Sequence, residues 1–260
     1  MKAKTKTKAL LMSLCAVLLV AASVLGTMAY LTDSKDVKNT FTVGNVAIKL
    51  DEAKVDEMGN LVKNQDDTLA DRVTHNEYKL LPNHTYVKDP TVTVLKPSVD
   101  SYVRMKVTFN KASQIIAMCT DPEYADEVTG VENAFPLIRM VNFVEANAAK
   151  WDGIIPDNMV DTEEMLADAK YFAYDAEADT LTYYFYYNEA VAAPTENVVL
   201  PVLFDSIKVP EWATNDQLKA LEGFEINVVA EAIQADGFVD ANGDPSADAA
   251  WTAFAAQMYK

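Results

Sequence analysis

The stretch Tyr102-Val103-Arg104-Met105-Lys106-Val107-Thr108-Phe109 predicts the fold more clearly than any other part of this sequence. Every second residue from Val103 to Phe109 is apolar, and the residues between them are charged or polar. A period of two residues is typical of a β-strand that buries one face against a core and turns the other outward. The sequence therefore predicts an antiparallel sheet with this strand at its centre.

Further strands and short helices are expected on both sides of this segment. Strands are predicted at 41–50, 91–95, 181–187 and 224–235, and helices at 111–119, 162–170, 211–221 and from 246 onward. The segment 198–204 is predicted to be an edge or bulged strand, because Pro201 has no N–H to give to a ladder. Many short strands with helices in the connections indicate a mainly β fold: a jelly-roll-like antiparallel β-sandwich.

The N-terminus has the three parts of a secretory signal peptide. Lysines alternate through the first eight residues, an uncharged apolar run follows from 9 to 26, and Thr27-Met28-Ala29 ends it. This pattern predicts a signal-peptide helix at 1–29, with Thr27 and Ala29 at the positions that a signal peptidase recognises and Tyr30 as the new N-terminus. A retained membrane anchor is the alternative, because the apolar run reaches the lower limit of a bilayer-spanning length.

The rest of the chain, 30–260, is expected to be a single β-sandwich domain. It shows no internal repeat and no low-complexity linker. Within it, 30–50 is a separate N-terminal segment or first strand, and 111–170 is predicted to be a helical insert region.

The charge of the chain excludes several partners. The predicted signal segment contains four of the 22 basic residues, which leaves 18 against 39 acidic ones, a net charge of −21. A charge of this size repels nucleic acids and anionic membrane surfaces, so we expect membrane contact only through the signal peptide. Half of the residues are hydrophobic, which indicates a folded domain and not a disordered acidic tail.

Few residues are suited to catalysis. There are two cysteines, Cys15 in the signal segment and Cys119, so the mature chain has no internal disulfide. The two histidines, His75 and His84, lie in polar stretches, and neither an H-E-x-x-H nor a G-x-S-x-G motif is present. We expect no enzymatic activity and no cofactor apart from the calcium ion considered next.

Two stretches have both a binding and a structural interpretation. Asp240, Asn242 and Asp244 place oxygen side chains at alternate positions of a glycine turn, which is a spacing that calcium loops use; the distal glutamate of the full pattern is missing, and a plain turn is the alternative. The aromatic run Tyr183–Tyr187 is either a platform for carbohydrate or a partner, or a strand with one core face.

Several motifs together resemble one bacterial family. Thr27-Met28-Ala29-Tyr30-Leu31-Thr32-Asp33, followed by Asn39-Thr40-Phe41-Thr42-Val43-Gly44-Asn45-Val46, is similar to the processing site and mature start of TasA/camelysin proteins of Gram-positive bacteria. The resemblance continues in Leu81-Pro82-Asn83, Lys88-Asp89-Pro90 and Tyr102–Val107, and ends in Phe224–Val228 and Ala232–Ala235. Residues 120–170 do not follow the family pattern.

The resemblance implies a secreted structural protein of the biofilm matrix or cell surface. Its partners would be a dedicated SipW-type signal peptidase during export, then further copies of itself or other matrix proteins. Fibres would form when the N-terminal segment of one subunit completes the sheet of the next. The expected donor residues are Phe41, Val43, Val46, Ile48 and Leu50; alternatively, this segment is the first strand of its own sandwich. A camelysin-type metallo-endopeptidase is the alternative function, and a calcium- or carbohydrate-binding surface module is a third.

Overall fold

The structure is a computed structural model that describes residues 32–35, 46–121, 123, 130–155 and 162–258. Residues from Thr32 to the C-terminus form one compact unit. The predicted signal-peptide helix lies outside the described residues. So do Phe41 and Val43 of the predicted donor segment.

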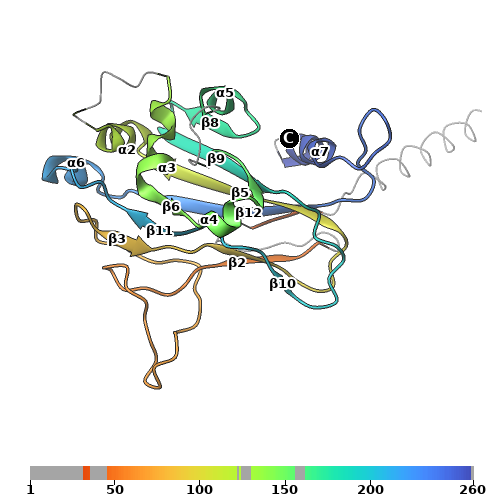
Figure 1. Cartoon of the computed structure of the whole chain (residues 1–260), viewed down its shortest axis with the longest axis horizontal. Coiled ribbons are helices and arrows are strands. Elements are labelled where there is room, and N and C mark those ends of the chain that lie inside the picture. Colours follow the sequence, from red (N-terminus) through yellow and green to blue (C-terminus); the bar gives the residue numbers. More distant parts are fainter. Residues whose placement is uncertain (1–31, 36–45, 122, 124–129, 156–161, 259–260) are drawn as a thin grey trace, which may run out of the picture. The chain divides into compact units, whose positions relative to one another are not determined.

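The prediction of a mainly antiparallel β fold with short helices in its connections is confirmed. The large sheet has the order β1 (Thr32–Lys35), β12 (Ile226–Gln234), β5 (Ser101–Asn110), β9 (Thr180–Tyr187) and β7 (Trp151–Asp152), with β8 (Phe172–Asp175) also on β9. One small sheet is β10 (Val198–Val199), β4 (Thr91–Val94) and β2 (Ile48–Asp51). The other is β3 (Thr85–Val87), β11 (Phe204–Lys208) and β6 (Val141–Phe143). The small sheets lie across the core from the large one (Figure 1).

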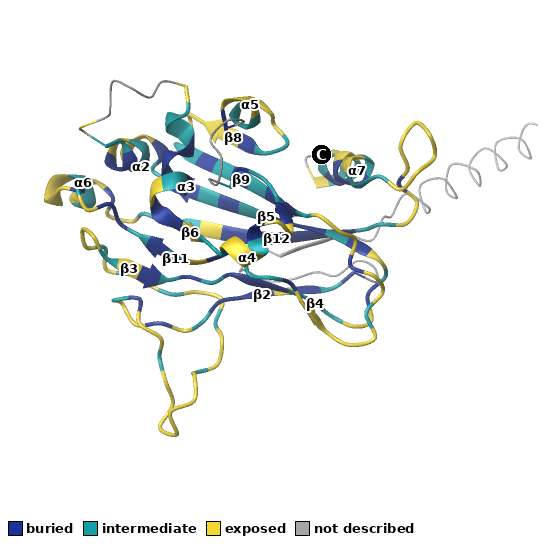
Figure 2. Ribbon diagram, in the orientation of Figure 1, coloured by how far each residue is buried: buried dark blue, intermediate teal, exposed yellow. Residues whose placement is uncertain are grey.

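The core lies between these layers, as the predicted alternation in β5 requires. Val103, Met105, Val107 and Phe109 are all buried, and Figure 2 shows the central strands as the darkest part of the ribbon. Phe143 of β6 contacts Phe185 of β9, with 5.9 Å between the ring centroids. Burial of such apolar surface is the main source of stability in a chain whose one described cysteine is unpaired.

Helices are short and lie in the connections. They are α2 (Ala112–Cys119), the 3₁₀ turn η1 (Glu132–Ala134), α3 (Phe135–Met140), α4 (Glu145–Ala148), α5 (Thr162–Ala167), α6 (Asn215–Ala220) and α7 (Ala247–Met258). The predicted helix at 211–221 begins later, because the side chain of Thr214 caps it by accepting a bond from the N–H of Gln217. In the described part of 111–170, five short helical segments are interrupted by the two short strands β6 and β7.

The segment 198–204, expected to be an edge or bulged strand, does not form one continuous strand. The segment divides into β10, at the edge of one small sheet, and β11, at the centre of the other. Pro201 lies between them, and its carbonyl accepts a bond from Trp151 Nε1 at 3.0 Å. A residue without an N–H cannot continue a ladder, so the chain changes sheet here.

Helix α7 covers the outer face of the large sheet. Trp251 and Phe254 lie over the Arg104 guanidinium, 4.5 and 5.2 Å from its central carbon to the ring centroids. The side of β5 predicted to face solvent is therefore partly buried, and Arg104 is only 6% exposed.

Candidate functional site

The N-terminal segment pairs with the edge of the large sheet. In β1, Thr32, Asp33, Ser34 and Lys35 lie opposite Ile233, Ala232, Glu231 and Ala230 of β12, in antiparallel register. Strand β12 continues to Ile226, where its other side still pairs with β5. Within the described part of the chain, no strand pairs with Ile226–Val229 on the β1 side. In the described part of the chain, an added strand could therefore pair with this half of the edge.

A second sheet edge lies beside the first. Strand β2 is the last strand of its small sheet and pairs with β4 alone among the described strands. It also lies close to both β12 and β1. We call the two neighbouring edges, Ile226–Val229 of β12 and Ile48–Asp51 of β2, the open seam.

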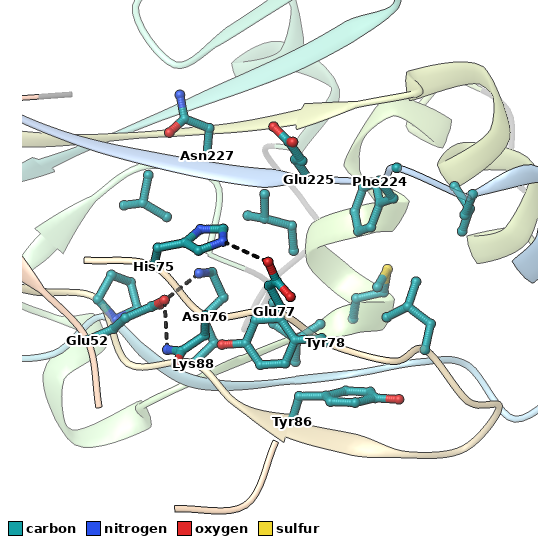
Figure 3. A pocket seen from close by; sticks show the side chains of 18 of the residues that line it. Glu52, His75, Asn76, Glu77, Tyr78, Tyr86, Lys88, Phe224, Glu225 and Asn227 are labelled. Atoms are coloured by element: carbon teal, nitrogen blue, oxygen red, sulfur yellow. Dashed lines mark hydrogen bonds and ion pairs between the residues drawn. The ribbon is translucent and has the colours of Figure 1, made fainter. Parts of the chain in front are cut away.

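A groove of about 1070 Å³ opens beside this seam. Both edges contribute to it, through Leu50 and Asp51 of β2 and through Ile226, Asn227 and Val228 of β12. The rest of its wall comes from the loop 74–80, from β3 and β11, and from the segment that joins α6 to β12. Figure 3 shows the side chains that line it.

The base of the groove is aromatic and ordered by hydrogen bonds. Tyr86 of β3 is 2% exposed; its hydroxyl donates to the Lys79 carbonyl at 2.6 Å and accepts from the Leu81 N–H at 2.7 Å. Tyr78 lies edge-on to it and donates to the Val87 carbonyl at 3.1 Å. Burial, reinforced by the nearby Glu52 carboxylate, raises the pKa of Tyr78, so both hydroxyls stay protonated and act as donors.

Ion pairs tie the arm beside the groove to β2. Arg72 Nε donates to Asp51 Oδ1 at 2.6 Å, and its other nitrogens reach Asp89 Oδ2 at 2.8 Å and Thr91 Oγ1 at 2.7 Å. Burial would lower the pKa of Arg72, but the two carboxylates outweigh it and raise the pKa. This arginine holds together β2, β4 and the arm at 52–73, which extends from the sheets in Figure 1.

The lining carries more negative than positive charge. Glu77, Glu222 and Glu225 line the groove in addition to Asp51 and Glu52, whereas its ammonium group comes from Lys88. Lys88 itself bonds Glu52 at 2.8 Å. The acidic side chains of the groove therefore favour groups that carry positive charge.

The structure describes three of the five predicted donor residues. Val46, Ile48 and Leu50 are buried in their own chain, where β2 pairs with β4 in continuous register. The alternative, in which this part is a first strand of its own sandwich, holds for these three residues. The processing residues Thr27, Ala29 and Tyr30 lie outside the described part of the structure.

The predicted calcium residues form a tight turn. Asp240 Oδ1 accepts bonds from the backbone N–H groups of Asn242 at 2.8 Å and Asp244 at 3.0 Å. These bonds lower the pKa of Asp240. Among the described residues, no three histidine, cysteine, aspartate or glutamate side chains are grouped so that they could hold a metal ion. Calcium binding at this turn stays a prediction.

The two histidines have different surroundings. His84 Nε2 lies 2.8 Å from the Met58 carbonyl, and its ring packs on Tyr86. His75 lies on the groove, and its side chain is 73% exposed, with Glu77 3.9 Å away. His84 thus has a structural contact, and only His75 is open to a ligand.

The remaining candidates are mostly buried. Tyr183, Phe185 and Tyr186 of the aromatic run are buried, so the carbohydrate platform is not a continuous exposed surface. Cys119 is buried too, and its desolvation raises the pKa of the thiol, opposed only weakly by Arg139. A buried neutral thiol is a poor nucleophile.

Sequence reasoning missed the polar residues around the groove. Glu52, Arg72, Asn76 and Lys88 lie in stretches for which the sequence predicts no strand or helix, and nothing in their spacing indicates that they meet. The sequence offered only a compositional signal, namely that charged residues follow the segment that forms β2.

Comparison with family models, with curated proteins and with solved structures gave no match in any of the three. No helix in the described ranges is long and apolar enough to cross a membrane.

Proposed function

We propose that this protein is an exported structural protein of the cell surface or extracellular matrix that assembles by exchange of its N-terminal strand. The observation that supports this most directly is the pairing of β1 with β12. Strand β1 begins two residues after the predicted new N-terminus at Tyr30, and it adds to a sheet edge by backbone pairing. The same pairing made by a neighbouring chain would link subunits head to tail.

The open seam supports the same proposal. A heterologous contact needs an acceptor edge that one copy leaves available and a donor that it can release. Strand β1 occupies four positions of β12, and the groove beside Ile226–Val229 offers apolar wall to the residues of a longer donor. Because Val46, Ile48 and Leu50 belong to their own core, the proposed donor is shortened to the residues before Val46.

The high negative charge fits this function as well. The acidic mature chain would repel its copies at long range, so that assembly depends on a specific pairing and is favoured by salt or by cations.

A pair of cysteines tests the exchange directly. Asp33 and Ala232 lie opposite each other in the β1–β12 register. We expect the double variant Asp33→Cys, Ala232→Cys to give a ladder of disulfide-linked oligomers on a non-reducing gel of assembled protein. Each single variant is the control and should give at most dimers. If the assembled double variant runs only as a monomer with an internal disulfide, strand exchange is wrong.

A further inference from the structure

A lysine, an asparagine and a glutamate meet at the wall of the groove. Lys88 Nζ donates to Glu52 Oε2 at 2.8 Å, and Asn76 Nδ2 donates to Glu52 Oε1 at 2.9 Å (Figure 3). One carboxylate therefore bridges an amine and a carboxamide. The three residues come from the end of β2, from the loop 74–84 and from the connection after β3.

The backbone holds each member of this group in place. Glu52 makes a two-way backbone bridge with Val73, with both N–O distances at 2.8 Å. Asn76 Nδ2 also donates to the Ala53 carbonyl at 2.9 Å, while its Oδ1 accepts the Val55 N–H at 3.0 Å. The amide is thus fixed at both ends, and an N–H already points at its carbonyl oxygen.

The charged pair lies where little water reaches it. The side chains of Lys88 and Glu52 are each 9% exposed, and the Tyr78 ring centroid is 5.9 Å from Lys88 Nζ. Separated charges are costly in such a place. Passage of one proton from the ammonium to the carboxylate, along the 2.8 Å contact, gives a neutral amine and a neutral acid without changing the total charge.

We propose that Lys88 and Asn76 form an intramolecular isopeptide bond, with Glu52 as the acid and base of the reaction. The lone pair of the neutral Lys88 Nζ attacks Cγ of Asn76, and the negative charge that develops on Oδ1 is stabilised by the Val55 N–H. Glu52 gives its proton to Nδ2 and takes one from Nζ. The Cγ–Nδ2 bond breaks, one ammonia leaves, and the amide between Nζ and Cγ remains.

The reaction needs no oxidant and no other reactant. One C–N bond forms and one breaks, and Nζ takes the place that Nδ2 leaves. The product has an N–H that keeps a donor near Glu52. The cross-link would close the chain between 76 and 88, a loop that carries Tyr78 and Tyr86 of the groove base. It would hold that wall in place whether or not the chain assembles with others.

Mass spectrometry of the purified full chain tests the proposal. We expect an intact mass lower than the sequence mass, or that of the processed chain, by the mass of one ammonia. A tryptic digest should contain one branched peptide in which 73–79 is joined to 80–104, because a modified Lys88 resists cleavage. An intact mass that matches the unmodified sequence, with 73–79 released as a free peptide, would overturn the inference.

Three variants separate this bond from other losses of ammonia. Asn76→Ala removes the acceptor and Glu52→Gln removes the proton carrier, so each should restore the mass expected for its own sequence. Asn242→Ala is the matched control, because Asn242-Gly243 can lose ammonia by cyclising on its own backbone, and this variant should keep the branched peptide. If the loss of ammonia disappears in Asn242→Ala and persists in Asn76→Ala, the isopeptide bond is excluded.

Discussion

Arg104 Nε donates to Glu231 Oε2 at 2.6 Å, across the β5–β12 ladder and beneath helix α7. Both side chains are buried, at 7% and 4% exposure, and Tyr186 accepts a second bond from the same guanidinium at 3.3 Å. Burial would lower the pKa of Arg104, but the Glu231 carboxylate outweighs it and raises the pKa. The pair lies directly behind the β12 edge that we propose for assembly, and it helps to join that strand to the sheet.

Removing one partner of this pair should lower the stability of the fold considerably. We expect Arg104→Met to lower the free energy of unfolding by about 3–5 kcal/mol, because it leaves the buried Glu231 carboxylate with only Lys106, 4.0 Å away, to offset its charge. The double variant Arg104→Met, Glu231→Leu should lower the free energy of unfolding much less. Urea unfolding followed by circular dichroism measures both. The exposed pair Lys150–Glu189, at 3.6 Å, provides the control, and Lys150→Met should change stability by less than about 1 kcal/mol.

Gly59 is expected to tolerate no side chain. Its φ of 75° lies in the left-handed region, and an added Cβ would come within 2.5 Å of the Tyr86 Cα. Gly59→Ala should therefore cost more than the roughly 1 kcal/mol of backbone strain alone, and it should shift β3 away from the groove. Gly243 has a φ of 89°, and a Cβ added there would meet no atom within 4 Å. Gly243→Ala therefore measures the cost of the backbone strain by itself. Equal losses of stability in the two variants would mean that the close contact has no effect.

Cys119 should react with thiol reagents only after unfolding. Its burial raises the pKa of the thiol, so the native chain holds the proton at a pH where an unfolded chain has begun to release it. Because the unfolded state binds fewer protons there, stability should fall as the pH rises above the ordinary thiol pKa of about 8.5. Labelling with iodoacetamide at pH 8, with and without urea, checks the first point. Rapid labelling of the native chain would contradict the burial of this thiol.

Asp240→Ala should weaken the turn at 240–244, since the two backbone N–H groups lose their acceptor. Because the pKa of Asp240 is lowered in the folded chain, its contribution is present above the unfolded pKa of about 3.9 and is lost as the pH falls through the folded value. Thermal melts of the two proteins should therefore converge in acid. We expect the same difference in calcium as in a chelator at neutral pH; a difference that appears only with calcium would instead support the calcium site.

A chain that begins at Val46 should stay folded and monomeric. It keeps β2, which pairs with β4 and is part of the core, but it lacks β1. A chain that begins at Tyr30 should form fibres under the same conditions. Electron microscopy and size-exclusion chromatography distinguish the two outcomes. Fibres from the chain that begins at Val46 would show that assembly does not need the N-terminal strand.

The sequence by itself determined the elements whose pattern is local. The two-residue period of 102–109 predicted β5, the apolar alternation from 224 predicted β12, and the aromatic run predicted β9, because burial on one face of a strand leaves a mark in every second residue. The helix predicted at 111–119 is α2. The mainly antiparallel β class followed from the number and shortness of these segments.

Only the tertiary structure decided which edges meet and which polar residues face each other. Pairing between β1 and β12 joins residues about 200 positions apart, and no local pattern encodes such a register. Glu52, Asn76 and Lys88 likewise come together because three segments cross at one end of the small sheets. Periodicity records how far each residue is buried, whereas the partner of a polar group depends on how distant segments pack, and so these contacts are decided by the fold as a whole.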